Sequence, residues 1–110
     1  MTTLDSYGKM SHDNAKEKGF WDQSGDDVAF LLSKLALVHS EISETLEAIR
    51  KEKGEEQIAE EVADTFIRLV DFYEGLKDFG FVSQDRCLDH VVTEKMMFNS
   101  TRPRKHGRLA

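Results

Sequence analysis

Apolar residues recur at intervals of three and four along most of this chain, and this spacing predicts helices and no strand. Four helical segments are expected, over about residues 4–18, 26–53, 55–77 and 83–100. Gly19, Gly54 and Gly80 lie in the gaps between them, where breaks in a helix are favoured. The pattern therefore predicts an all-α fold, a helical bundle of about four helices.

The segment 26–53 carries the clearest pattern. Residues 24–27 (Ser-Gly-Asp-Asp) supply an N-cap and first-turn acids. The apolar residues of the segment form one stripe along a helix: Val28, Leu31, Leu32, Leu35, Val38, Ile42, Leu46 and Ile49. Glu41 and Glu44 fall on the flank of this stripe, so we expect these two carboxylates to be partly buried.

The segment 55–77 has an apolar stripe on one side and a group of charged residues on the other. Its main apolar stripe contains Ala59, Val62, Ala63, Phe66, Leu69, Val70 and Tyr73. Glu61 and Asp64 lie on the other side of the helix, together with Glu60, Arg68 and Asp71. We therefore expect the apolar stripe to pack against another helix or a second subunit, which predicts a homo-oligomer, a dimer or tetramer.

A polar residue and a proline mark the expected start and end of the last helical segment. Ser83 is the expected N-cap of the segment 83–100, with Asp85 in its first turn. Pro103 prevents the helix from continuing. Residues 101–110 form a basic tail, for which a flexible tail and an ordered lid are both open.

Composition narrows the class of protein. The 110 residues, 39% hydrophobic and 33% charged, predict a single globular domain over residues 1–110. A single cysteine excludes an intramolecular disulfide, and no apolar run approaches the roughly 20 residues of a membrane span. The N-terminus lacks a signal pattern, so we expect a soluble, cytoplasmic protein with no membrane partner. The net charge of −6 argues against nucleic acid as a partner.

Two short acidic motifs are the main candidates for chemistry. Glu41 and Glu44 are three residues apart, as are Glu61 and Asp64, so each pair projects from one face of its helix. Antiparallel helices joined near Gly54 would place Glu44 and Glu61 at similar heights. Four converging carboxylates repel one another unless a cation binds, and oxygen ligands suit Mg²⁺. An ordinary solvated acidic surface is the alternative.

The histidines help to choose between metals. Di-iron carboxylate bundles use Glu-x-x-His motifs. None of the four histidines in this chain has a glutamate three positions before it. The sequence therefore favours an all-oxygen site for Mg²⁺, with Mn²⁺ as a substitute, over a site for iron or zinc.

Two further groups of residues have both a structural and a functional interpretation. Phe20 and Trp21, in an expected turn, could stack on a nucleobase or fill the core. Lys95 and Asn99 are four residues apart and share one helix face, which could bind a ligand or simply face solvent.

Taken together, these motifs resemble those of the MazG-like all-α nucleoside triphosphate pyrophosphohydrolases. The likeness covers roughly residues 19–108 and includes Gly19-Phe20-Trp21 and His106-Gly107. It rests mainly on Glu41-x-x-Glu44, Glu61-x-x-Asp64 and the downstream Lys95-x-x-x-Asn99-x-x-Arg102.

The resemblance implies Mg²⁺-dependent hydrolysis of (deoxy)nucleoside triphosphates to monophosphates and pyrophosphate. The two acid pairs would hold Mg²⁺, and the substrate would contact Lys95, Asn99, Arg102 and Trp21. One of the glutamates or Glu60 would orient or deprotonate the attacking water. For this role we choose Glu44, with Glu41 as the second catalytic residue. The alternative function is a non-enzymatic helical dimer that acts as an interaction or regulatory module.

Overall fold

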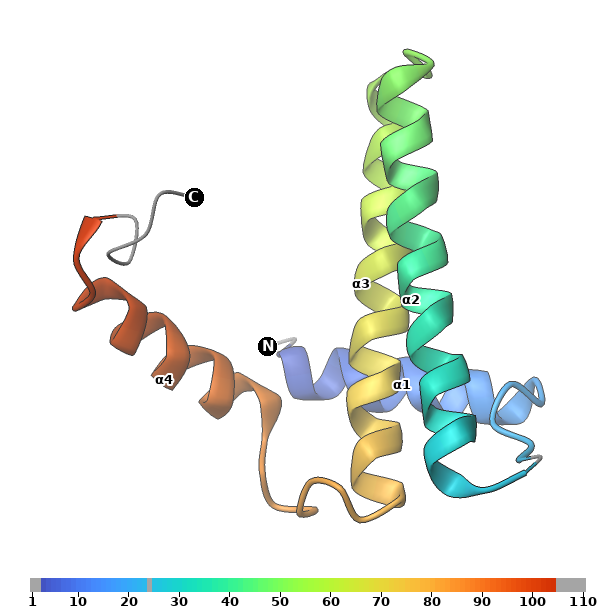
Figure 1. Ribbon diagram of the computed structural model, residues 1–110, viewed down its shortest axis with the longest axis vertical. Helices are drawn as coiled ribbons and strands as arrows, with labels where there is room; N and C mark the ends of the chain where they lie inside the picture. Colours follow the sequence, from blue (N-terminus) through green and yellow to red (C-terminus); the bar gives the residue numbers. More distant parts are fainter. Residues whose placement is uncertain (1–2, 24, 105–110) are drawn as a thin grey trace.

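The computed structural model describes residues 3–23 and 25–104, and this part of the chain contains helices and no strand. The helices are α1 (Leu4–Glu17), α2 (Asp27–Arg50), α3 (Glu55–Asp78) and α4 (Leu88–Ser100). Figure 1 shows α2 and α3 side by side as an antiparallel hairpin, with α1 crossing the base of the hairpin and α4 leading away from it. The predicted all-α fold with four helices is confirmed.

The first three helices begin where local capping predicts. Thr3 and Ser6 form a capping box at the start of α1. The Asp26 carboxylate accepts the Ala29 N–H at the start of α2. Gly54, with φ of 101°, allows the tight turn into α3. The predicted bounds of these three helices therefore differ from the observed ones by no more than three residues.

The predicted start of the last helix is wrong. α4 begins at Leu88, with Cys87 at the N-cap position, rather than at Ser83. The Ser83 hydroxyl donates to Asp85 within a preceding turn, so a local side-chain bond replaces the expected cap. The acid in the first turn of α4 is Asp89.

Trp21 is partly buried and lies over a position of α3 that has no side chain. A Cβ atom added at Gly75 of α3 would lie 2.6 Å from Cζ3 and 2.8 Å from Cζ2 of the indole, and closer still to Cη2. The indole also packs edge-on against His12, with ring centroids 4.9 Å apart, and against Phe30 at 5.9 Å. The buried apolar residues of the core are Ala15, Phe30, Leu31, Val38, Ala48 and Val70.

A buried histidine joins α1 to α3. The two ring nitrogens of His12, which is 4% exposed, lie 2.7 Å from Asp71 and 2.6 Å from Asp78. The Trp21 indole N–H also donates to Asp71, at 2.8 Å. Burial alone would lower the pKa of His12, but hydrogen bonds to the two carboxylates outweigh it and raise that pKa above its usual value. The imidazolium is therefore the stabilised form.

A second polar contact lies at the other end of the interface between α1 and α3. The buried Lys77 ammonium is 3.2 Å from Glu74 and 3.3 Å from Asp5. The Asp89 carboxylate of α4 accepts the backbone N–H groups of Leu4 and Asp5, at 2.9 and 2.8 Å. Hydrogen bonds and charges therefore fix the start of α1 against both α3 and α4.

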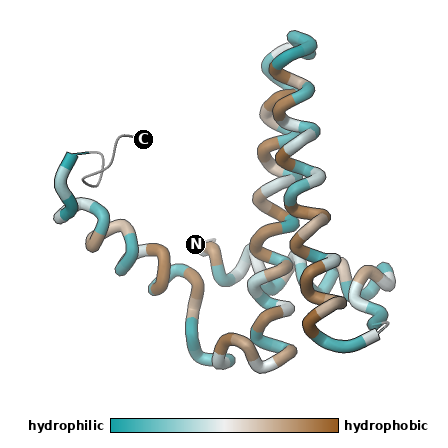
Figure 2. The backbone as a smooth tube through the Cα atoms, viewed as in Figure 1, coloured by the Kyte–Doolittle hydropathy of each residue, from teal (hydrophilic) through white to brown (hydrophobic). Residues whose placement is uncertain are grey.

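The predicted apolar stripes are buried only near the base of the hairpin. Leu31 and Val38 are buried, whereas Ile42, Leu46 and Ile49 are each more than half exposed. Figure 2 shows that apolar residues continue along both helices toward the tip of the hairpin. They form an open groove of about 490 Å³, here called the apolar groove, lined by Ile42, Thr45, Leu46, Ile49, Val62, Thr65, Phe66 and Leu69.

No helix among residues 3–23 and 25–104 is long and apolar enough to cross a membrane. The predicted tail continues past Arg104 into residues 105–110, which lie outside the described residues, as does Ser24. The alternatives of a flexible tail and an ordered lid stay open.

Candidate functional site

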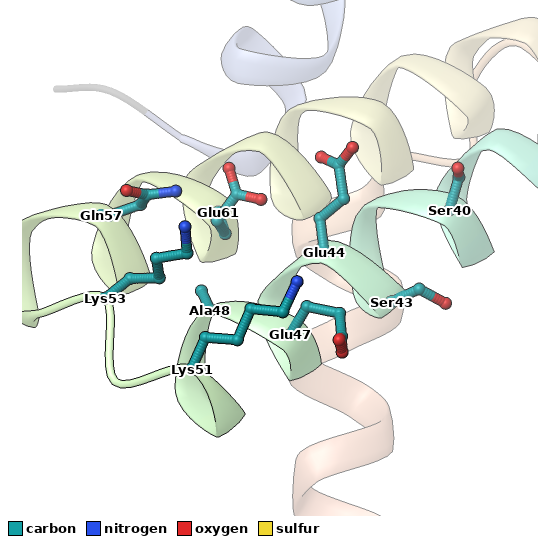
Figure 3. A pocket seen from close by; sticks show the side chains of 9 residues that line it. All are labelled: Ser40, Ser43, Glu44, Glu47, Ala48, Lys51, Lys53, Gln57 and Glu61. Carbon is teal, nitrogen blue, oxygen red and sulfur yellow. The ribbon is translucent and has the colours of Figure 1, made fainter.

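The two acid pairs face each other across the α2–α3 hairpin, but they open into two neighbouring hollows. Glu44 and Glu61 line a hollow of about 490 Å³ near the hairpin turn, together with Lys51 and Lys53. Figure 3 shows the Glu44 and Glu61 carboxylates on the same side of the two helices.

The second hollow, here called the Phe20 hollow, lies between α1 and the hairpin. Its volume is about 260 Å³. Glu41 and Asp64 reach it from α2 and α3, so each hollow receives one acid from each predicted pair. The residues that line it are Ser11, Asn14, Ala15, Phe20, Glu41, Asp64, Ile67, Arg68 and Asp71.

The carboxyl group of Glu61 is affected by burial and by the neighbouring acids. The pKa of Glu61 is raised by desolvation and by the negative charges of Glu44 and Asp64, with a smaller effect from Glu41. Acids from both helices therefore meet near Glu61, as the spacing of the two motifs predicts. Their mutual repulsion disfavours the fully ionised set unless a cation offsets it.

The donor atoms fit Mg²⁺ in chemical type, since all four side chains offer carboxylate oxygens. Desolvation and, after it, the charges of Glu44 and Asp64 raise the pKa of Glu61, and a divalent cation would offset these charges. Within residues 3–23 and 25–104, however, no three His, Cys, Asp or Glu side chains are arranged to hold one ion. The residues are suitable ligands, and the structure divides them between two hollows.

Arg68 links the acids to an aromatic side chain. Its Nε lies 3.5 Å from Glu41 Oε1, and its guanidinium carbon lies 5.2 Å from the centroid of the Phe20 ring. This ion pair therefore joins α3 to α2. Glu41 is thereby held in place on the wall of the Phe20 hollow.

The two adjacent aromatic residues have different surroundings. Trp21 is partly buried against His12 and Phe30 and donates to Asp71, whereas Phe20 is 45% exposed and lines the Phe20 hollow. The role of Trp21 in binding substrate stays a prediction. In this arrangement Phe20 is the aromatic residue that a ligand beside Glu41 would meet.

Three of the predicted substrate-binding residues, Lys95, Asn99 and Arg102, lie on α4 or just after it, and they line neither hollow. Lys95 and Arg102 both lie over the Phe98 ring, at 5.0 and 5.6 Å from its centroid. Asn99 Oδ1 is buried and has no hydrogen-bond partner in the described part of the chain. Because α4 leads away from the hairpin (Figure 1), one chain does not bring these residues to the acid pairs.

Several residues of the site were not selected from the sequence. Arg68 and Asp71 could have been found, because they follow Glu61 and Asp64 at helical spacing on the same polar side of α3. Nothing in the local sequence singles out His12, because its partners lie 59 and 66 residues away. Lys51 and Lys53 of the hairpin turn were also not selected, because only the folded hairpin places them beside Glu44 and Glu61.

Comparisons of the chain with protein-family models, curated proteins and solved structures found no significant match. The resemblance to the MazG-like family thus rests on the motifs quoted above.

Proposed function

We propose that this protein is a Mg²⁺-dependent nucleotide pyrophosphohydrolase of the MazG-like kind, which converts (deoxy)nucleoside triphosphates to monophosphates and pyrophosphate. The observation that carries the proposal is that Glu44 of α2 and Glu61 of α3 line one hollow, with their carboxylates on the same side of the two helices. Negative charges that meet in this way are typical of a site for a divalent cation. The acidic motifs and the downstream basic motif support the same function.

The proposed chemistry assigns different tasks to the glutamates of α2. Bound Mg²⁺ would offset charge on the phosphate oxygens. Glu41 is held by Arg68, whereas Glu44 is exposed and forms no ion pair in the described part of the chain. Glu44 is therefore freer to accept a proton. Water attacks phosphorus at the α–β phosphoanhydride and forms a new P–O bond, while Glu44 takes the proton of the water. The bridging P–O bond breaks, and the products are the monophosphate and pyrophosphate.

The test is pyrophosphate release from a panel of canonical, deoxy and modified triphosphates, with and without Mg²⁺. Removing a general base typically costs about 10²–10⁴-fold in rate, so we expect a loss of that order in Glu44→Gln. Glu56→Gln is the matched control, because Glu56 is exposed in the first turn of α3 and lines neither hollow. Unchanged rates in both Glu44→Gln and Glu61→Gln would refute the assigned site.

A second readout needs no catalysis. In metal-free buffer, Glu61→Gln removes one of the charges that repel one another, so its melting temperature is expected to exceed that of the wild type. Added Mg²⁺ is expected to stabilise the wild type and to have a smaller effect on the variant. A wild-type melting temperature that does not respond to Mg²⁺ would contradict the metal assignment.

We further propose that the site is completed by a second copy of the chain, in a dimer or tetramer. Within residues 3–23 and 25–104 the apolar groove is open, and α4, which contacts α1 through Asp89, has no buried residue. Met96, Met97 and Phe98 are each more than half exposed. Covering such surfaces is a common reason for assembly. An α4 supplied by a neighbour would bring Lys95 and Arg102 to the acids.

Co-expression of two inactive variants tests the shared site. Chains that carry Lys95→Ala and chains that carry Glu61→Gln are each expected to be inactive, because each lacks one half of the site. Mixed oligomers would contain sites with both halves intact and would regain part of the activity. A monomer in sedimentation velocity, or mixed oligomers without activity, would contradict a shared site.

The exposed apolar groove also favours the alternative function, a helical interaction or regulatory module without catalysis. That module would bind a partner through the groove and would use its acids only for solvation. It predicts no pyrophosphate release and no change in melting temperature with Mg²⁺ or nucleotide.

A further inference from the structure

The hollow near the hairpin turn, here called the turn hollow, is lined by basic as well as acidic side chains. Glu44 and Glu61 reach it from α2 and α3, and Lys51 and Lys53 reach it from the turn that joins these helices. Because α2 and α3 are antiparallel, the two lysines lie nearer the tip of the hairpin than the two glutamates do (Figure 1). The turn hollow therefore has an acidic part and a basic part at different heights along the hairpin.

The two lysines form no ion pair or side-chain hydrogen bond in the described part of the chain, although glutamates lie beside them. Lys51 follows Glu47 by four residues, a spacing at which ion pairs along one helix are common. Figure 3 shows the Glu47 carboxylate turned away from the carboxylates of Glu44 and Glu61. The ammonium groups of Lys51 and Lys53 line the hollow instead, so they are accessible to an anionic ligand.

Backbone hydrogen bonds fix the turn that carries the lysines. The Lys53 N–H donates to the Ala48 carbonyl oxygen at 2.9 Å. The Glu52 N–H donates to the Ile49 carbonyl oxygen at 3.1 Å, and the two bonds together form a Schellman motif. Glu52, with φ of 50°, occupies the left-handed position of this motif and does not line the hollow. Lys51 and Lys53, on either side of it, therefore reach the hollow from a backbone of defined shape.

The charges of the turn hollow suit a polyphosphate when a divalent cation is bound. Three glutamates and two lysines line it, which leaves one excess negative charge. A Mg²⁺ ion held by Glu44 and Glu61 would reverse this sign and attract phosphate oxygens.

The position of the lysines along α2 indicates which phosphate they would meet. Lys51 lies two helical turns, about 10 Å, beyond Glu44, whereas Glu41 and the Phe20 hollow lie on the opposite side of Glu44. With the reacting α–β bond beside Glu44, a chain of phosphates that extends toward the turn would bring its far end to Lys51 and Lys53.

We propose that Lys51 and Lys53 bind the terminal phosphate of the substrate and make this protein prefer nucleoside triphosphates to diphosphates. A diphosphate contains the same α–β phosphoanhydride and gives the same monophosphate, with inorganic phosphate in place of pyrophosphate. It lacks the phosphate that would reach the lysines, so it forfeits their charge-assisted hydrogen bonds. This inference rests on the proposed function, since it assigns the specificity of the same site.

Matched pairs of nucleotides test the inference: dATP with dADP, dCTP with dCDP, dGTP with dGDP and dTTP with dTDP. The measured quantity is kcat/KM for monophosphate release, with Mg²⁺ and full-length protein. A hydrogen bond to a charged group corresponds to about tenfold to a hundredfold in affinity, so wild type is expected to favour each triphosphate by about tenfold or more. Equal values within each pair that reacts overturn the inference and leave the proposed function standing. Monophosphate release from none of these nucleotides overturns both.

A double variant with Lys51→Gln and Lys53→Gln tests whether the lysines cause the preference. Its kcat/KM is expected to fall about tenfold or more for triphosphates and much less for diphosphates. The loss should lie mainly in KM, because the contacts are remote from the reacting bond. Weakened Mg²⁺ binding or a distorted turn would lower both classes of nucleotide equally, and that result overturns the role of the lysines. The variant with Lys51→Arg and Lys53→Arg keeps both charges and is expected to keep the preference.

Binding of inorganic pyrophosphate, measured calorimetrically with Mg²⁺, gives a readout without turnover. The double glutamine variant is expected to bind it about tenfold more weakly than wild type. Lys18→Gln is the matched control and should bind it as wild type does, since Lys18 is an exposed lysine at the end of α1 and lines neither hollow. No binding by wild type, or equal affinity in wild type and the double variant, overturns the assignment.

Discussion

Replacing Gly75 by alanine tests the packing of Trp21 on α3. The added Cβ would lie within 3 Å of three indole atoms, whereas real Cβ atoms keep more distance than this. The ring cannot turn aside freely, because His12 and Phe30 pack against it and its N–H is bonded to Asp71. Steric overpacking of a filled core costs about 1–3 kcal/mol, and this enclosed ring predicts the upper end of that range.

A compensating gain reduces the net effect. Alanine stabilises a helix interior by about 1 kcal/mol relative to glycine, so the free energy of unfolding of Gly75→Ala is expected to fall by about 2 kcal/mol. With about 2.1 cal/mol/K of unfolding entropy per residue over 110 residues, the melting temperature would fall by about 9 °C. Urea denaturation followed by circular dichroism measures the loss. Emission of Trp21, the single tryptophan, reports whether its ring has moved.

Gly8→Ala is the matched control, because Gly8 is also a buried helical glycine of the same interface. Its added Cβ would meet Glu74 Cγ and the Val70 carbonyl oxygen at 3.3 Å, which needs only a small adjustment. We expect its stability to stay within about 1 kcal/mol of the wild type. The clash also predicts that Gly75→Ala costs less in a Trp21→Leu background. The packing argument is refuted if Gly75→Ala is as stable as Gly8→Ala with unchanged Trp21 emission.

Three further predictions concern charged groups of the fold. Because the pKa of His12 is raised in the folded protein, the stability that its imidazolium contributes is complete below about pH 6.5 and is lost as the pH rises through the higher folded-state pKa. Urea midpoints across this range should fall in the wild type and in the exposed-site control His90→Gln, but not in His12→Gln. Lys77→Met removes one partner from a buried ion-pair cluster and should cost about 3–5 kcal/mol in urea denaturation. The same change at the exposed Lys9 should leave the urea midpoint nearly unchanged, and equal effects would contradict the burial of Lys77. Hydrogen bonds from the backbone N–H groups of Asp5 and Leu4 lower the pKa of Asp89 despite the opposing effect of desolvation, so the stability that Asp89 contributes is present above the unfolded pKa of about 3.9 and is lost as the pH falls through the lower folded value. Asp89→Asn should remove this part of the acid unfolding profile, and an unchanged profile would argue against these hydrogen bonds.

Local rules in the sequence account for the helices but not for the surfaces that they bury. Asp26 and Gly54 mark helix ends through side-chain capping and backbone conformation, which depend only on neighbouring residues. The stripe that contains Ile42 and Leu46 was also identified correctly as apolar, but periodicity cannot show which neighbour covers it. In one chain these residues stay exposed, because α2 and α3 meet through other faces.

The candidate site was predictable to a similar extent. The spacing and the short hairpin predict acids from both helices close together, and Glu44 and Glu61 do line one hollow. Spacing could not show that Glu41 and Asp64 open into a different hollow. The Phe20 hollow was not predictable, because Asn14 and Asp71 meet only after α1 crosses the hairpin. The position of α4, and so of Lys95, depends on a turn whose Ser83 was mistaken for a cap.

The buried charges between α1 and α3 also determine the register of these two helices. Sliding α1 by one helical turn, about 5.4 Å, would carry His12 away from both aspartates and Asp5 away from Lys77. A buried charge left without its partner costs about 3–5 kcal/mol, whereas apolar contacts are non-directional and can be exchanged for other apolar contacts after a shift. Misaligned arrangements of α1 are consequently penalised far more than an all-apolar interface would penalise them.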